Sequence, residues 1–443
     1  MNSAVFFRNF NVPLPEVSHG EGVYLFDKSG KRYLDAVGGA AVVSIGHGVK
    51  EITDAVARYG RDIPYTYAMT FTHAWQEELA QSLVSIAPDD FATVYFVSGG
   101  SEANETAIKM ARQYFLQRGV ASKYKILSRS QSFHGVTIGT LAVSGRVTWR
   151  APFSPYLPSF PSVVPPYCYR CPFGLTYPGC QVACADDLER AILQEGPETV
   201  AAFLAEPISG TSMTGVTPVA EYYRRVREIC DQYDVLLIAD EVLTGFARTG
   251  PPFAIQHWNV KPDLITCGKA LGSGYAPLGA VIVSQKITDA YRFGTGEFTH
   301  GFTYSGHALS CFVGLQVFRY MTEHGLFQRP AQIGAYLHER LAELATRHST
   351  IGDVRGRGLL AGIEFVADRD TRAPLRASED VSRQIARSAF DRGLMIIAGT
   401  PGLNYGRGGD HIQISPPYII NTEQVDEIVE ILDEVIGLVE AKL

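Results

Sequence analysis

The chain has 443 residues, of which 46% are hydrophobic and 19% are charged. Such a composition is typical of a globular protein with roughly two to four domain-sized cores. The formal net charge of −7 is spread without a block of like charges, so neither nucleic acid nor an anionic membrane surface is an expected partner.

The sequence has no segment typical of a membrane protein or of a signal peptide. No apolar run approaches the roughly 18 residues of a spanning helix. Residues 1–15 carry Arg8 and Asn9 where a signal peptide would need its apolar core. We therefore expect a cytoplasmic protein without a membrane partner.

The predicted elements begin with a β-hairpin over residues 22–36, with residues 27–30 as its turn. Farther along the chain, short β-rich runs alternate with longer helical patterns, which predicts a mainly parallel sheet covered by helices. The strands expected in this sheet are residues 93–98, 125–128, 200–205, 235–239, 263–266 and 280–283.

Two of the intervening helices have recognisable beginnings. Ser101 can cap a helix whose apolar residues recur every three or four positions, and Pro218 can open another helix at its first turn. The later elements are helices over residues 378–391 and 422–440 and strands over residues 359–365 and 411–414.

The element pattern predicts an α/β protein with two domains. The large domain is expected over residues 61–330 and contains the mainly parallel sheet. Residues 1–60 and 331–443, from the two ends of the chain, are expected to form one smaller α+β domain. No internal repeat or low-complexity linker marks the boundaries.

Lys269 lies where a surface lysine is unexpected, between the apolar run 264–268 and the small-residue stretch 270–274. A desolvated ε-amine has a lowered pKa and is a nucleophile near pH 7, the state that condenses with an aldehyde to form a Schiff base. Asp240 follows the strand expected at 235–239. An acid and a lysine at the ends of successive buried strands suit a pyridoxal phosphate (PLP) site, where the acid keeps the pyridine nitrogen protonated.

Further candidates follow other expected strands. The turn with Gly100 and Ser101 places backbone N–H groups at a helix start and suits a phosphate, although such turns are also common connectors. Phe133 and His134 follow the second expected strand. The aromatic face of Phe133 either stacks on a planar cofactor ring or packs in the core. Glu206 lies at the end of a buried strand, where its carboxylate either belongs to a binding site or caps a helix or loop. Because open α/β sheets bind ligands at the carboxyl ends of their strands, we assign all these residues to the cofactor site.

Four of the seven cysteines cluster, and two interpretations are open. A C-x2-C pair is followed by a looser C-x3-C pair, a spacing that is compatible with zinc. Neighbouring prolines and aromatic residues equally suit an irregular loop that packs its thiols. We favour the packed loop and assign no metal ligand. The cluster consists of Cys168, Cys171, Cys180 and Cys184.

Residues 240–250 (DEVLTGFARTG) and 261–272 (KPDLITCGKALG) resemble the class III (ω-amino) aminotransferases of PLP fold type I. The likeness extends from about Gly22 to Glu440. It implies a large domain with a mainly parallel seven-stranded sheet covered by helices. It also implies a homodimer with active sites at the subunit interface and leaves a tetramer open.

The same resemblance implies a role for each residue of the site. Lys269 forms the Schiff base with PLP and moves the proton, and Asp240 pairs with the pyridinium. Val242 and Phe133 enclose the ring, with Phe133 at a position where many relatives have tyrosine. The implied ligands of the phosphate are Gly100, Ser101 and, from the neighbouring subunit, Thr303.

Departures from the family pattern bear on the substrate. Relatives that use 2-oxoglutarate have an arginine before a late Pro-Pro pair, ion-paired to a strand-end glutamate. Gln413 stands there, so Glu206 has no obvious cationic partner. Arg407 resembles the movable substrate-binding arginine of amine:pyruvate relatives, with a solvated loop arginine as the alternative. Leu243, where many relatives have glutamine, also favours that branch, and the small residues 38–41 predict room for long or bulky ω-amines.

We therefore predict a ping-pong transamination. An amine or ω-amino acid gives its nitrogen to PLP, and a 2-oxo acid, pyruvate in preference to 2-oxoglutarate, collects it. PLP-dependent decarboxylation and aminomutation stay open on the same scaffold. A nicotinamide-dependent dehydrogenase is the remote alternative, because residues 272–274 (GSG) lack the third glycine of a dinucleotide-binding motif.

Overall fold

The computed structural model describes residues 3–399 and 410–443. At its centre is a seven-stranded sheet with the order β4-β10-β9-β8-β7-β5-β6. The central neighbours are parallel, and β10 alone runs antiparallel to both β4 and β9. The predicted mainly parallel sheet is confirmed. Its strands are β4 (Phe91–Val97), β5 (Lys125–Arg129), β6 (Ser162–Val163), β7 (Val200–Ala205), β8 (Leu236–Asp240), β9 (Leu264–Cys267) and β10 (Gly279–Ser284).

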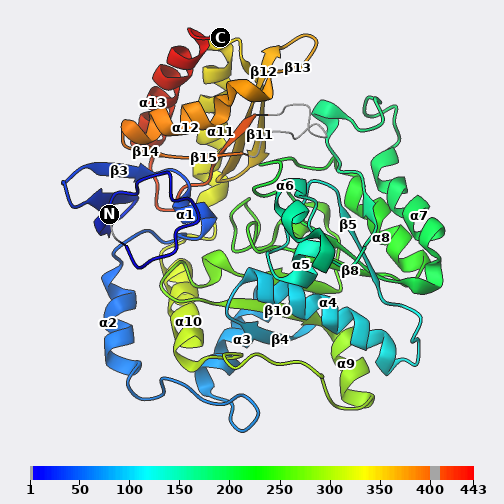
Figure 1. Cartoon of the computed structure of the whole chain (residues 1–443). Coiled ribbons are helices and arrows are strands. Elements are labelled where there is room, and N and C mark those ends of the chain that lie inside the picture. Colours follow the sequence, from blue (N-terminus) through cyan, green and yellow to red (C-terminus); the bar gives the residue numbers. More distant parts are fainter. Residues whose placement is uncertain (1–2, 400–409) are drawn as a thin grey trace.

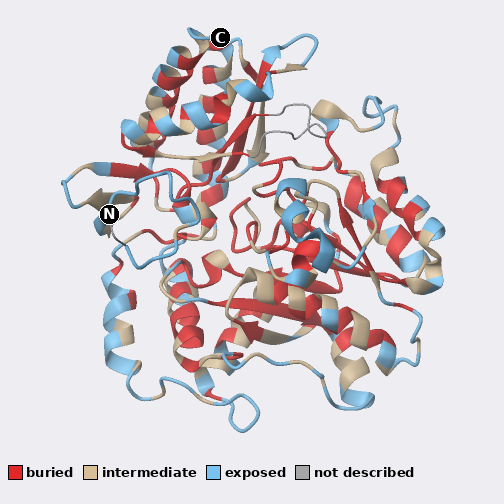
Figure 2. Ribbon diagram, viewed as in Figure 1, coloured by how far each residue is buried: buried red, intermediate tan, exposed pale blue. Residues whose placement is uncertain are grey.

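Helices cover both faces of this sheet, and its central strands are buried (Figure 2). Every residue of β7, β8 and β9 is buried, which explains why these strands are continuous apolar runs rather than alternating ones. The helices of this part of the chain are α3 (Ala74–Ile86), α4 (Gly100–Gln117), α5 (Ile138–Ala142), α6 (Val147–Arg150), α7 (Ala183–Glu195), α8 (Tyr222–Gln232), α9 (Gln285–Phe293) and α10 (Ala308–Glu323).

Two smaller sheets lie beside the central one (Figure 1). One joins both chain ends, because Leu394 of the late strand pairs with Leu34 of the early hairpin. Its strands are β1 (Val17–Glu21), β2 (Tyr24–Asp27), β3 (Arg32–Asp35) and β14 (Leu394–Met395). The other contains β11 (Ile351–Arg357), β12 (Leu360–Asp368), β16 (His411–Ile414) and β15 (Ile397–Ala398), with β13 (Ala373–Pro374) paired to β12.

The remaining helices belong to the two ends of the chain. The last helices pack on the C-terminal sheet, where α13 contacts both α11 and α12. The shared sheet supports the proposal that residues 1–60 and 331–443 form one domain beside 61–330; these boundaries stay a prediction. The helices are α1 (Gly38–Ala41), α2 (Lys50–Tyr59), α11 (Arg329–Arg347), α12 (Val381–Asp391) and α13 (Thr422–Glu440).

The structure corrects two of the predicted helix starts. Ser101 is not a cap, because α4 begins at Gly100 and the N-cap position is held by Gly99 without a side-chain hydrogen bond. Pro218 does not open a helix either, since α8 begins at Tyr222. The predicted hairpin is confirmed as β2 and β3. Across the described residues, no helix combines the length and apolarity needed to cross a membrane.

Candidate active site

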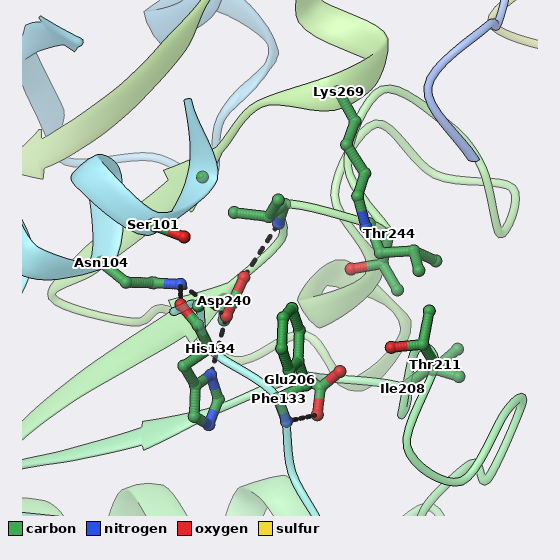
Figure 3. A pocket seen from close by; sticks show the side chains of 14 residues that line it. Ser101, Asn104, Phe133, His134, Glu206, Ile208, Thr211, Asp240, Thr244 and Lys269 are labelled. Atoms are coloured by element: carbon green, nitrogen blue, oxygen red, sulfur yellow. Dashed lines mark hydrogen bonds and ion pairs between the residues drawn. The ribbon is translucent and has the colours of Figure 1, made fainter. Parts of the chain in front are cut away.

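A cavity of 180 Å³ lies at the carboxyl ends of the central strands, and the predicted residues of the site meet there. Asp240 ends β8, Glu206 follows β7 and Lys269 follows β9. Figure 3 shows their side chains directed into this space. The lining residues are Gly100, Ser101, Asn104, Phe133, His134, Gly135, Glu206, Ile208, Thr211, Asp240, Val242, Leu243, Thr244 and Lys269.

Asp240 is only 4% exposed and is held by hydrogen bonds on both oxygens. Its Oδ2 accepts from Asn104 Nδ2 at 2.8 Å and lies 2.7 Å from His134 Nδ1, and its Oδ1 accepts from the Val242 N–H at 3.1 Å (Figure 3). A buried carboxylate needs such donors, because leaving it unpaired costs several kcal/mol or more. Asp240 is therefore fixed in position and direction.

Asn104 is a residue of the site that the sequence analysis missed. It lies in the first turns of α4 and is itself fixed, because Thr266 Oγ1 donates to its Oδ1 at 2.7 Å and its Nδ2 also donates to the His134 carbonyl oxygen. The available signal was an asparagine on the buried face of a helix, where its side chain must find tertiary partners.

Lys269 begins a short 3₁₀ turn after β9 and has a φ of 44°. That left-handed conformation is unfavourable for a residue with a side chain and is typical of functional sites. Burial lowers the pKa of Lys269 to about 8, and Arg248 acts in the same direction, while Asp240 and Glu206 oppose the shift. The amine is therefore neutral to a much greater extent near physiological pH than that of an ordinary lysine, and the neutral form is the one that a nucleophile or a base requires.

The turn before α4 combines a glycine, a hydroxyl group and a helix N-terminus beside the cavity. A Cβ added at Gly100 would lie 2.5 Å from Val242 Cγ1, so only glycine leaves room there. The Ser101 hydroxyl accepts from the Val136 N–H at 3.2 Å and lines the cavity. Together with the N-terminus of an 18-residue helix, these groups form an anion-binding arrangement.

PLP fits the residues of this cavity. Its phosphate suits the helix N-terminus at Gly100, its ring nitrogen suits the fixed carboxylate of Asp240, and its aldehyde suits the amine of Lys269. Phe133 and Val242 both line the cavity and offer apolar walls for the ring. The fit rests on the donor set, and on the close packing of Gly100 against the Val242 side chain, which leaves no room for a Cβ at the start of α4.

Two predicted residues are not among those that line the cavity. Thr303 lies outside the lining, where its carbonyl oxygen accepts from Tyr65 Oη at 3.0 Å. Arg407 lies outside the described residues.

In the part of the chain that the structure describes, all seven cysteines are free and no group of three or more histidine, cysteine or acidic residues is placed to hold a metal ion.

Comparisons with known proteins give a consistent result. The family model for class-III aminotransferases matches residues 8–436. YodT, an uncharacterised aminotransferase of Bacillus subtilis, is 39% identical over 97% of this chain and 96% of its own. The putrescine–pyruvate aminotransferase of Pseudomonas aeruginosa is 35% identical over 93% of this chain and 88% of its own. A solved amine transaminase from an uncultivated Pseudomonas species, in its PLP-bound form, has a TM-score of 0.90 at 34% identity, covering 99% of this chain and 97% of that one.

The pKa of Lys269 predicts how the protein without cofactor captures PLP. The rate of capture, followed by the absorbance of the product, should rise as the pH passes through about 8, because the neutral amine is the reacting form. A free lysine derivative is the control and should show its rise near its own pKa of about 10.4. If the protein and the free lysine derivative showed the same pH profile of PLP capture, the assignment of Lys269 as a lysine with a lowered pKa would be contradicted.

The hydrogen bond from Asn104 predicts a positioning role. Asn104→Leu removes the Nδ2 donor to Asp240 while keeping the side-chain volume, and we expect turnover to fall about tenfold or more, the usual effect of losing a hydrogen bond to a charged group. Circular dichroism checks that the variant is folded, and the cofactor absorbance should shift as well. Wild-type turnover with an unshifted spectrum would show that Asp240 needs no support from α4.

Proposed function

The chain belongs to the class III aminotransferases, and on this premise we propose that it moves the amino group of an amine or ω-amino acid to pyruvate. Its reaction is PLP-dependent transamination. The observation that carries the proposal is the meeting of Lys269, Asp240 and the glycine turn at Gly100 in one cavity. Neither the family match nor the relatives support decarboxylation, aminomutation or nicotinamide-dependent oxidation.

PLP supplies an aldehyde to receive the amino group and a ring that withdraws electrons. In our proposal, the neutral amine of Lys269 would remove the proton from the substrate carbon and deliver it to C4′ of the cofactor. The Asp240 carboxylate, held by Asn104 and His134, keeps the pyridine nitrogen protonated. The role of these two donors is to hold that carboxylate in place as charge develops.

Contacts to the ring and the phosphate complete the proposed cofactor site. Phe133 and Val242 enclose the ring, and Gly100 with Ser101 binds the phosphate at the start of α4. Thr303, which does not line the cavity of its own chain, would contact the phosphate of a second copy, as the homodimer implied by the family resemblance requires. A homodimer with sites at the interface remains our proposal, which leaves a tetramer open, and a cytoplasmic location remains a proposal as well.

Gln413 supports pyruvate over 2-oxoglutarate as the acceptor. Its side chain is buried and its amide donates to Ser415 Oγ at 2.9 Å, so it presents no charge to a second carboxylate. A neutral amide cannot replace the bidentate, charged fork of an arginine. We propose Arg407 as the residue that binds the single carboxylate of pyruvate.

The segment α1 supports a pocket open to long or bulky amines. Gly38, Gly39, Ala40 and Ala41 have φ values of 54°, 56°, 72° and 62°, so the turn is left-handed over its whole length. A bulky residue would be strained in this conformation, which keeps the side chains small. Ala41 belongs to the same buried hydrophobic cluster as Ile208, a residue of the cavity wall, which supports placing this turn next to the proposed substrate space.

Replacement of Lys269 tests the proposed base. Lys269→Ala should abolish turnover, because no other amine of the cavity takes up the proton, while PLP remains bound through its phosphate and ring contacts. Activity is measured with an amine and pyruvate, and retained cofactor by absorbance after gel filtration. Wild-type turnover in this variant would disprove the assignment.

The acceptor is tested by the choice of oxo acid. With one amine donor, we expect a higher kcat/KM for pyruvate than for 2-oxoglutarate, because Gln413 offers no charge to the second carboxylate. Gln413→Arg is the matched variant and should narrow the difference. A wild-type preference for 2-oxoglutarate would contradict the proposed acceptor and leave the transamination itself intact.

A further inference from the structure

Two cysteines outside the cofactor cavity have no role in the proposed amino transfer. Cys168 begins a short 3₁₀ turn, Cys168–Arg170, and Cys171 directly follows this turn. Both thiols are free, and Cys168 is exposed while Cys171 is half-buried. They line one cavity of 430 Å³, which shares no lining residue with the cavity that contains Lys269. The pair is therefore open to a reagent from solution.

The geometry of the turn brings the two thiols together. Side chains three residues apart eclipse one another in a 3₁₀ helix, and three residues at a rise of about 2.0 Å separate their Cα atoms by about 6 Å. A disulfide joins Cα atoms that lie roughly 4.4–6.8 Å apart. Burial raises the pKa of Cys168, and Cys171 raises it further, as expected of a neighbouring thiol. A bridge between the two residues thus requires rotation of their side chains and little movement of the main chain.

The two residues between the cysteines hold the turn in place. Arg170 Nε donates to Glu364 Oε1 at 2.6 Å, and the same guanidinium donates to the main-chain oxygen of Arg372 at 2.6 Å. The Arg372 guanidinium donates in turn to the Tyr169 carbonyl oxygen and lies 4.9 Å from the centroid of the Tyr169 ring. Because Glu364 is fully buried, breaking its ion pair with Arg170 is costly. The turn is therefore kept in the conformation that aligns the thiols.

The other two thiols of the cluster lie in the same region without completing a metal site. Burial raises the pKa of Cys184 to about 12, with further contributions from Cys168, Cys180 and Cys171. Among residues 3–399 and 410–443, however, no three potential ligands are placed to hold a metal ion. Two aligned thiols without a third ligand suit the chemistry of thiols and disulfides.

We propose that Cys168 and Cys171 form a reversible dithiol–disulfide site that reacts with a low-molecular-weight disulfide such as glutathione disulfide, independently of the proposed amino transfer. The exposed Cys168 thiolate attacks one sulfur of the reagent and releases one glutathione thiol. The Cys171 thiolate then attacks the Cys168 sulfur of the mixed disulfide and releases the second. Two protein thiols are oxidised, one glutathione disulfide is reduced to two thiols, and the two thiol protons pass to these products.

The surroundings of Cys168 favour a lasting bridge over a strongly oxidising one. A dithiol–disulfide site is a strong oxidant where the protein stabilises its reduced form, as a stabilised thiolate does. Burial instead disfavours the Cys168 thiolate and raises its pKa. We therefore expect the disulfide to persist in the presence of glutathione disulfide and to open with a strongly reducing dithiol.

The test uses the PLP-loaded enzyme and needs no variant. The protein is incubated with glutathione disulfide at about pH 8.5, near the ordinary pKa of cysteine. Alkylation of the remaining thiols and peptide mapping by mass spectrometry should then identify a Cys168–Cys171 disulfide, with the loss of two hydrogen atoms. Dithiothreitol should restore both thiols. A bridge from either residue to Cys180 or Cys184, a persistent glutathione adduct, or no reaction would each overturn the proposal.

Two variants test the order of the steps. Cys171→Ser removes the second attacking thiol, so glutathione should stay attached to Cys168 as a mixed disulfide. Cys184→Ser is the matched control, which removes a thiol of the same cluster and should still form the Cys168–Cys171 bridge. If the Cys171→Ser variant acquired no glutathione at Cys168, or if the control lost the bridge, the proposed exchange would be wrong.

Discussion

The burial of charged groups at the end of a parallel sheet is the constraint on which the site depends. Asp240, Glu206 and Lys269 share one cavity, and a buried charge persists only where it is paired, hydrogen-bonded or neutralised. Each group meets this demand differently. Asp240 has side-chain donors from two elements, Glu206 has main-chain donors, and the Lys269 amine has a pKa of about 8. The same desolvation thus acts on a fixed acid, on a second carboxylate held by main-chain donors, and on a base.

Much of this arrangement could be predicted from the sequence because buried parallel strands are continuous apolar runs. The bounds of β7, β16 and α13 match the prediction residue for residue. Once the strands are placed, the residues that follow them must meet at one edge of the sheet. Glu206 was found in this way, whereas Lys269 was already marked by the apolar run before it and the small residues after it.

The features that could not be predicted depend on tertiary contacts, which no local sequence pattern indicates. Asn104 looks like an ordinary helix residue until Thr266 and Asp240 are placed beside it. The handedness of α1 is equally hidden, because two alanines at positive φ contradict their own preference and are held by the surrounding packing. The strand β11 was not predicted, since its sequence IGDVRGR lacks both alternation and an apolar run.

The pairing of β3 with β14 has a consequence for how the protein is made. Leu34 leaves the ribosome 360 residues (394 − 34) before its partner Leu394. The first hairpin must therefore wait with an unpaired edge while the central sheet forms, and such exposed edges invite association with other chains. The late closure of this sheet identifies the nascent chain, rather than the finished enzyme, as the stage most exposed to aggregation.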